Sequence, residues 1–302
     1  MTPDRSAPAL VDAVVSTQWL ADHLGSERLV VLDASVIVLG ADSSTASGKT
    51  TYLSGYDQYL FDGHIPGAVF GDLVESFSEQ GAAYPFTRPS LETFTEAARA
   101  AGVGDDCTIV VYDTAYGQFA SRLWWLFRSF GHARVAVLDG GFVRWRAEGR
   151  PIDDGHVESI DGSFTAREDT RHWVDKAFVE AVLRGEERAV LVCGVPPREF
   201  SGETGGRARP GHIPGSFNVP AGRLVDRATN SSVPLAELRE RFAPALASAA
   251  PGTRIVAYCA GGVTSAADAL ALTRLGVTDV AVYDGSLAEW SADADAPLVT
   301  GA

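Results

Sequence analysis

The sequence predicts an α/β protein made of two similar domains in tandem, each a mostly parallel sheet flanked by helices. Short apolar runs typical of buried strands alternate with longer segments whose apolar residues recur at helical spacing. The chain also repeats itself, because residues 63–67 read GHIPG and residues 211–215 read the same five letters. Its 302 residues suffice for two domains of about 140 residues, each with its own core.

Two further landmarks recur in the same order and at nearly the same spacing. Residues 109–113 read IVVYD and residues 255–259 read IVAYC, while VLDG at 137–140 returns as VYDG at 282–285. Three landmarks in register indicate a duplicated domain.

Changes in composition suggest where the domains begin and end. We expect a first domain at residues 14–149, a polar linker at 150–171 and a second domain at 172–300. Gly155 and Gly162 suit an exposed crossing segment.

Capping residues and breaks in the apolar pattern set the bounds of each expected element. In the first domain these elements are a helix at 19–24 capped by Ser16 or Thr17, a strand at 29–33, a surface loop at 40–54, a helix at 90–101 opened by Ser90, a strand at 108–112, a helix at 119–130, a strand at 135–138 and a short helix around Trp145. In the second domain they are a helix at 175–183, a strand at 189–192, a helix at 235–242, a strand at 253–257, a helix at 266–275, a strand at 280–283 and a short helix around Trp290.

Composition and charge narrow the function classes. The net charge of −14 disfavours nucleic acid, because phosphates would meet a repulsive surface. No apolar run is long enough for a transmembrane helix, and the N-terminus has no secretory signal pattern. Three widely spaced cysteines argue for a reducing, cytoplasmic location rather than a disulfide framework, and no Cys/His cluster has the spacing of a zinc site. We therefore expect no membrane, nucleic-acid or metal partner.

Cys259 has the most informative position in the chain. It follows the apolar strand 253–257 and stands in a glycine-rich turn just before the helix 266–275. Backbone N–H groups converge in such a turn, and the helix dipole adds partial positive charge there. Both effects favour the thiolate, which is the nucleophilic form of cysteine. The alternative is a buried, inert cysteine at a strand end.

The residues after Cys259 offer backbone donors rather than charged side chains. Gly261 and Gly262 allow a tight curl with positive φ, and we expect the hydroxyl of Thr264 or Ser265 to cap the following helix. The expected cradle for an anion consists of the backbone N–H groups of Ala260, Gly261, Gly262, Val263, Thr264 and Ser265.

With these motifs the chain resembles the tandem rhodanese-type sulfurtransferases, the family of thiosulfate and 3-mercaptopyruvate sulfurtransferases. HIPGAVF at 64–70, RLWW at 122–125 and the Cys259 loop stand in the family's order, and the resemblance covers about residues 14–298. It implies that Cys259 takes a sulfane sulfur from a small anionic donor as a persulfide. The expected acceptor is cyanide, a small thiol or a thioredoxin-like protein, and no cofactor is implied.

The same resemblance predicts that only one half is active. Asp113 stands where the first half would carry its cysteine, and an aspartate cannot carry sulfur. The first domain is therefore expected to be catalytically inactive and to wall the site of the second.

Arginines are the expected ligands of the anionic donor. The family carries two of them between the strand 189–192 and the second GHIPG, nine positions apart in mercaptopyruvate enzymes, and Arg198 and Arg207 keep that separation. Aligned on Phe200, however, Glu199 takes the place of the first arginine, and Arg209 competes with Arg207 for the second role.

The first half offers two more candidates. Arg122 could face the site across the domain interface, or it could be a solvated arginine on a helix. His64 could face the cysteine, as the resemblance implies, or it could tie down its own turn like His212 in the second half.

The donor itself stays open between thiosulfate and 3-mercaptopyruvate. The neutral Ala260 and Gly261 differ from the basic residues of thiosulfate enzymes and favour 3-mercaptopyruvate. Gly261, however, replaces the serine that mercaptopyruvate enzymes use to help protonate the leaving enolate. Cys193 and Val195 replace the usual Asp and Arg of the neighbouring strand end.

Two other functions and one question about Cys193 remain open from the sequence. A Cys-dependent phosphatase would need an arginine where Ser265 stands, and a non-catalytic persulfide carrier would need only Cys259. Cys193 is either a redox partner of Cys259 or apolar packing.

Overall fold

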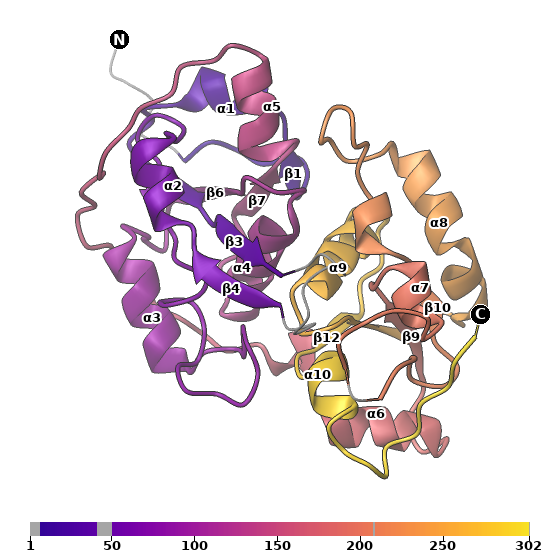
Figure 1. The fold of residues 1–302 in the computed structure, drawn as a ribbon. Coiled ribbons are helices and arrows are strands. Elements are labelled where there is room, and N and C mark those ends of the chain that lie inside the picture. The colour runs from indigo at the N-terminus through magenta and orange to yellow at the C-terminus, as the bar shows by residue number, and fades with distance from the viewer. Residues whose placement is uncertain (1–6, 41–49, 208, 302) are drawn as a thin grey trace.

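The structure is a computed structural model that describes residues 7–40, 50–207 and 209–301. These residues form two α/β domains that lie side by side (Figure 1). The first domain contains β1 (Val14–Val15), α1 (Thr17–His23), β2 (Leu29–Asp33), β3 (Val36–Leu39), β4 (Thr51–Ser54), α2 (Tyr56–Phe61), β5 (Val69–Phe70), α3 (Leu91–Ala100), β6 (Thr108–Tyr112), α4 (Gln118–Ser129), β7 (Val135–Leu138) and α5 (Gly141–Ala147). The second contains η1 (Thr170–His172), β8 (Trp173–Val174), α6 (Lys176–Leu183), β9 (Ala189–Cys193), α7 (Pro197–Phe200), β10 (Phe217–Asn218), η2 (Ala221–Arg223), α8 (Leu235–Ser248), β11 (Arg254–Tyr258), α9 (Thr264–Arg274), β12 (Val280–Tyr283) and α10 (Ser286–Trp290).

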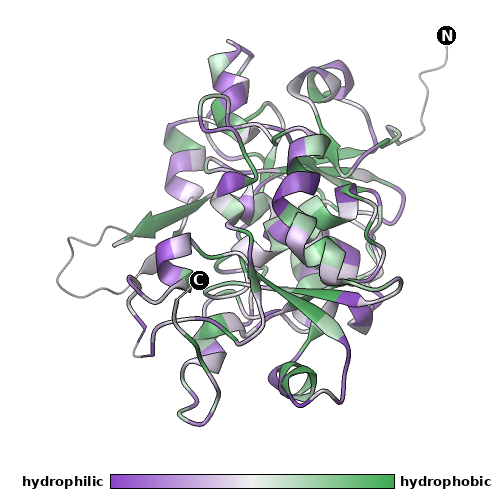
Figure 2. Ribbon diagram, turned by 90° about the vertical axis from the view of Figure 1, so that its right-hand side faces the viewer, coloured by the Kyte–Doolittle hydropathy of each residue, from purple (hydrophilic) through white to green (hydrophobic). Residues whose placement is uncertain are grey.

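Both domains are built on a five-stranded parallel sheet. The strand orders are β1-β7-β6-β2-β5 in the first domain and β8-β12-β11-β9-β10 in the second, so equivalent strands occupy equivalent places. The strands are hydrophobic, while the surrounding helices mix hydrophobic and hydrophilic faces (Figure 2). The predicted fold class and its duplication are confirmed.

Buried apolar side chains explain why these segments fold as they do. The central strands β6 and β11 are buried along nearly their whole length, as strands covered on both faces must be. The tryptophans expected in the core are all buried: Trp124, Trp125, Trp145 and Trp290. Ser16 caps α1 through the Trp19 N–H at 3.0 Å, and Ser90 caps α3 through the Thr93 N–H at 3.1 Å.

The prediction of a surface loop at residues 40–54 is wrong in part. Strand β3 pairs antiparallel with β4, so residues 51–54 belong to a hairpin that reaches toward the second domain (Figure 1). Residues 41–49 lie outside the described part of the chain. The alternation of exposed and half-buried residues along β4 is the period of a strand, and the polar composition of the segment hid it.

The segment at residues 150–171 is held more tightly than an exposed linker. The N–H groups of Gly162 and Phe164 donate to the carbonyls of Arg99 and Val103 at 2.8 and 3.1 Å. A Cβ at Gly162 would lie 1.9 Å from the Val103 carbonyl oxygen, so this close approach requires glycine. The segment therefore runs along the first domain before the second begins.

Helices α4 and α9 form the centre of the domain interface. Each follows the central strand of its own sheet, and each buries most of its residues, Arg122 and Asp268 included. This contact brings the start of each helix close to the other domain. No helix among the described residues is long and apolar enough to cross a membrane.

Candidate active site

Cys259 lies directly beyond the end of β11, at the carboxyl edge of the second sheet. Cys259 is 1 % exposed. Its N–H donates to Ser286 Oγ at 3.1 Å, and its carbonyl accepts from the Leu287 N–H at 3.0 Å. Ser286 is fully buried with φ +49°, a left-handed conformation that non-glycine residues rarely adopt. The sequence did not lead us to predict that Ser286 would accept the Cys259 N–H. The only hint in the sequence is a serine directly after Asp284 and Gly285.

The backbone that follows Cys259 presents donors without acceptors. Within the described part of the chain, the N–H groups of residues 260–265 donate to no protein acceptor. The expected cap by Thr264 or Ser265 is wrong, because Val263 holds the N-cap position of α9 and no side chain accepts a hydrogen bond there. All the donors of this turn are thus available to an anion at Cys259.

The equivalent loop of the first domain is filled by its own side chain. Asp113 Oδ1 accepts the N–H groups of Ala115 and Gly117 at 2.9 and 3.0 Å. Its Oδ2 accepts those of Phe119 and Ala120, both at 2.9 Å. Burial raises the pKa of Asp113, and the four donated bonds oppose that shift. Three of these four donors, at residues 115, 117 and 119, correspond to residues 261, 263 and 265, whose N–H groups have no acceptor within the described part of the chain. The fourth corresponds to Ala266, whose N–H donates to the Val263 carbonyl at 3.0 Å.

The two loops have the same length but curl differently. The left-handed residue is Gly117 in the first, at φ +88°, and Gly262 in the second, at φ +80° and one position earlier relative to the helix. A Cβ at Gly262 would lie 2.7 Å from the Asp284 carbonyl oxygen and 3.4 Å from Arg122 Nη1, so glycine is required here.

Arg122 crosses the domain interface to hold this curl in place. Its guanidinium is fully buried and donates to the Gly262 carbonyl at 3.1 Å, the Phe86 carbonyl at 2.6 Å and Asp284 Oδ1 at 2.7 Å. Asp284 Oδ2 accepts the Arg88 N–H at 2.8 Å. Arg122 is therefore neither a solvated helix arginine nor a free anion ligand.

Two tyrosines of the first domain lie within electrostatic reach of Cys259. Burial raises the pKa of Tyr52 and of Tyr116, and negative charge on Cys259 raises both further. Tyr52 belongs to β4 and contacts Phe86 edge to face, at 4.8 Å between ring centroids. Tyr116 belongs to the Asp113 loop, so the hairpin and the Asp113 loop each carry a tyrosine whose pKa is raised by Cys259.

The second-domain arginines are engaged by other groups. Arg207 pairs with Glu199 at 2.5 Å, and these side chains are 16 % and 20 % exposed. Arg198 is 72 % exposed and pairs with Glu203 at 3.3 Å. Arg209 donates to the backbone carbonyls of residues 293 and 296.

The acid paired with Arg207 affects a tyrosine whose pKa Cys259 also raises. Glu199 adds to the rise in the pKa of Tyr52, after burial and the charge of Cys259. Glu199, which takes the place of the family's first arginine, is thus a negative charge in the electrostatic environment of Tyr52, offset by its pair with Arg207.

His64 lies inside its own turn. It is fully buried, with Nδ1 3.0 Å from the Ile65 carbonyl and Nε2 3.1 Å from the Gly155 carbonyl, and it stacks on Tyr59. His212 is placed alike in the second domain, with Nδ1 2.9 Å from the Phe200 carbonyl. Neither set of contacts involves the Cys259 loop.

Cys193 is buried in the core of the second domain. It pairs in register with Tyr258 in the neighbouring strand, and its thiol shares a sheet face with the Tyr258 hydroxyl. Burial raises the pKa of Cys193 to about 12. Cys107, Cys193 and Cys259 are all free cysteines.

Asp268 is the residue near Cys259 that sequence reasoning missed. It lies in the second turn of α9, is fully buried, and neither carboxyl oxygen has a hydrogen-bond partner among the described residues. Burial raises the pKa of Asp268 well above its usual range, and the charge of Cys259 adds to the rise. An acid within a run of small apolar residues was the one signal in the sequence.

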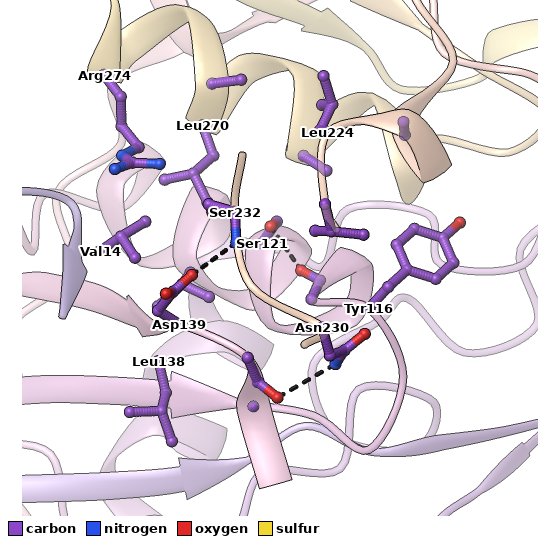
Figure 3. Close-up of a pocket in the computed structure, with 18 of the residues that line it drawn as sticks. Val14, Tyr116, Ser121, Leu138, Asp139, Leu224, Asn230, Ser232, Leu270 and Arg274 are labelled. Atoms are coloured by element: carbon purple, nitrogen blue, oxygen red, sulfur yellow. Dashed lines mark hydrogen bonds between the residues drawn. The ribbon is translucent and has the colours of Figure 1, made fainter. Parts of the chain in front are cut away.

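Cys259 is not among the residues that line a cavity between the domains, although Tyr116 is (Figure 3). Two polar contacts join the domains at this cavity: Asn230 Nδ2 donates to the Gly140 carbonyl at 3.2 Å, and the Ser232 N–H donates to Asp139 Oδ1 at 2.7 Å. Among the described residues no group of His, Cys, Asp or Glu is arranged to hold a metal ion.

Comparisons with known proteins agree with this architecture. The Rhodanese-like domain model matches residues 16–148 and 182–293. The 3-mercaptopyruvate sulfurtransferase of Escherichia coli K12 is 33% identical over 288 residues, covering 94% of this chain and 96% of its own. The thiosulfate sulfurtransferase of Gallus gallus is 32% identical over 289 residues, covering 94% and 95%.

A solved structure is similar over nearly the same extent. The crystal structure of SseA from Escherichia coli superposes with a TM-score of 0.76 at 32% identity, covering 91% of this chain and 98% of that one. The chain therefore belongs to the rhodanese family, as a sulfurtransferase with two rhodanese-like domains in tandem.

Replacing the buried acid tests its protonation. In the unfolded chain Asp268 loses its proton near pH 4, whereas burial raises its pKa in the folded protein. The free energy of unfolding therefore falls as pH rises above about 4. We expect Asp268→Asn to raise Tm at pH 8 by about 2–4 °C, with the gain shrinking toward zero near pH 4. Calorimetry across this range, with the exposed Glu240→Gln as control, measures it. A lower Tm at pH 8, or a gain independent of pH, contradicts the assignment.

Proposed function

We propose that the protein moves a sulfane sulfur from a small anionic donor to a thiol, thioredoxin-like or cyanide acceptor, with Cys259 as the carrier. The observation that carries this proposal is a run of backbone N–H groups, at residues 260–265 directly after a buried cysteine, that have no acceptor among the described residues. Such donors stabilise an anion without any charged side chain.

The chemistry follows from this environment. The Cys259 thiolate attacks the transferable sulfur of the donor, a new S–S bond forms, and the bond between that sulfur and the rest of the donor breaks. The product is a persulfide whose outer sulfur carries the charge, and the same N–H groups can hold it. A nucleophilic acceptor then attacks the outer sulfur and restores the thiolate.

The first domain contributes walls and no second reaction centre. Asp113 fills the donors of its own loop with its carboxylate, and no cysteine stands there. Tyr52, Tyr116 and Arg122 bring the first domain to the Cys259 loop instead. One sulfur per chain is the expected load.

The charge near Cys259 favours 3-mercaptopyruvate over thiosulfate as donor; relatives are named for each. Thiosulfate is a dianion, whereas 3-mercaptopyruvate carries one carboxylate while its thiol is protonated. Glu199 offsets most of the charge of Arg207, and residues 260–263 are uncharged. A monoanion therefore meets less repulsion than a dianion.

Intact mass after reaction with 3-mercaptopyruvate tests the carrier. We expect the mass of one added sulfur, which cyanide removes. Cys259→Ser should not gain this mass, because a serine hydroxyl cannot form a persulfide. Cys107→Ser and Cys193→Ser should load normally, since Cys107 lies at the amino end of β6 and Cys193 is held as a thiol. A persulfide that survives Cys259→Ser contradicts the proposal. Loading without catalytic turnover would instead indicate a persulfide carrier.

Removing the charge of Glu199, which pairs with Arg207, tests the preference for 3-mercaptopyruvate over thiosulfate. In Glu199→Gln the neutralising charge is gone, so we expect kcat/KM for thiosulfate to rise about 3–10-fold, and by more than for 3-mercaptopyruvate. Glu203→Gln is the matched control, because it removes the same charge from the exposed pair with Arg198. Equal effects of both substitutions, or a larger gain for 3-mercaptopyruvate, would refute the role of the Glu199–Arg207 pair.

A further inference from the structure

Asp268 is a buried acid without a hydrogen-bond partner among the residues that the structure describes. Its carboxyl group is fully buried, and the hydroxyl of Ser265, one turn earlier on the same face of α9, is likewise buried and unpaired within this part of the chain. Buried polar groups are nearly always hydrogen-bonded, because an unpaired one costs its whole desolvation energy. Groups kept at such a cost cluster at functional sites.

The surroundings of Asp268 place it at the carboxyl edge of the second sheet, where Cys259 also lies. A Cβ at Gly194 would lie 2.3 Å from Asp268 Oδ2 and 3.6 Å from Thr264 Oγ1, so the carboxyl group rests against the end of β9. The Gly194 N–H donates to the carbonyl of Tyr258, the residue before Cys259. Asp268 raises the pKa of Tyr116 and of Cys193, and the charge of Cys259 raises the pKa of Asp268.

Asp268 holds a proton near the Cys259 loop. No donor among the described residues contacts its carboxyl oxygens, so burial raises its pKa well above the usual range, and the charge of Cys259 adds to the rise. The N–H groups of residues 260–265, which have no acceptor within the described part of the chain, can stabilise negative charge on sulfur. The protein thus stores an acid near its nucleophile.

The reaction with 3-mercaptopyruvate needs such an acid. When the sulfur leaves, the electron pair of its C–S bond stays on the methylene carbon as the enolate of pyruvate, which must take up a proton. Residues 260–263 carry no side chain with a transferable proton, and the Cys259 residue is shielded from bulk water.

We propose that Asp268 is the proton donor for the leaving group in sulfur transfer from 3-mercaptopyruvate, with the Ser265 hydroxyl able to pass the proton. The O–H bond of Asp268 breaks and a C–H bond of pyruvate forms. The new Cys259–S–SH then gives its proton to the Asp268 carboxylate, which leaves Cys259–S–S⁻ in the cradle. This step rests on the proposed role of Cys259 as sulfur carrier.

A pair of donors separates this role from a structural one. Loading from 3-mercaptopyruvate expels a carbanion that needs a proton, whereas loading from benzenethiosulfonate expels a sulfinate that is stable as an anion. For Asp268→Asn we expect the single-turnover rate of loading to fall at least about tenfold with 3-mercaptopyruvate. Loading from benzenethiosulfonate and alkylation of Cys259 by iodoacetamide should stay within about twofold, because neither needs the acid.

The pH profile supplies an independent readout. Wild-type loading from 3-mercaptopyruvate should decline at alkaline pH as Asp268 ionises, and this limb should vanish in Asp268→Asn. Gly194→Ala, which pushes a Cβ against the carboxyl group, should reproduce the donor-dependent loss, and Glu240→Gln should behave as wild type.

The outcomes distinguish the role of Asp268 as proton donor from the role of Cys259 as sulfur carrier. Equal loss with both donors, or no loss with 3-mercaptopyruvate, overturns the role of Asp268 while leaving Cys259 as carrier. Failure of the wild-type protein to load sulfur from either donor overturns the carrier itself.

Discussion

The site depends on backbone N–H groups that have no acceptor within the described part of the chain. Residues 260–265 connect a buried strand to a helix, and their N–H groups have no acceptor in this part of the described structure. Unpaired donors are costly, so the loop favours an anion at Cys259. The equivalent loop of the first domain has a similar need, since Asp113 meets it with a carboxylate and four hydrogen bonds.

Contacts across the domain interface hold this loop in place. Arg122 reaches from α4 to the Gly262 carbonyl and to Asp284, while Ser286 Oγ accepts the Cys259 N–H. The first domain, whose equivalent loop carries Asp113 in place of a cysteine, thus helps to position the Cys259 loop. The buried Asp268 then adds a proton where the loop has none to give.

Much of this arrangement could be predicted from the sequence because it depends on local pattern. Strand, glycine turn and helix around Cys259 follow from periodicity, and the repeated landmarks predict the duplication. What the sequence hides are contacts made across the interface. Arg122 looks like a surface arginine until α4 meets α9, and nothing local distinguishes the buried Asp268 from a solvated acid. Likewise, Glu199 could be recognised as a departure, but its pairing with Arg207 depends on the fold of the loop.

The central claim is that an anion on Cys259 satisfies these donors, and the stability of the loaded protein tests it most directly. Thermal unfolding is compared for protein loaded with sulfur and for Cys259→Ser, whose neutral hydroxyl brings no negative charge to the same donors. Hydrogen bonds to a charged group contribute about 1.5–3 kcal/mol, so we expect the persulfide form to melt at least about 2–4 °C higher than Cys259→Ser. A loaded form that melts at the same temperature as Cys259→Ser, or below it, would contradict this claim.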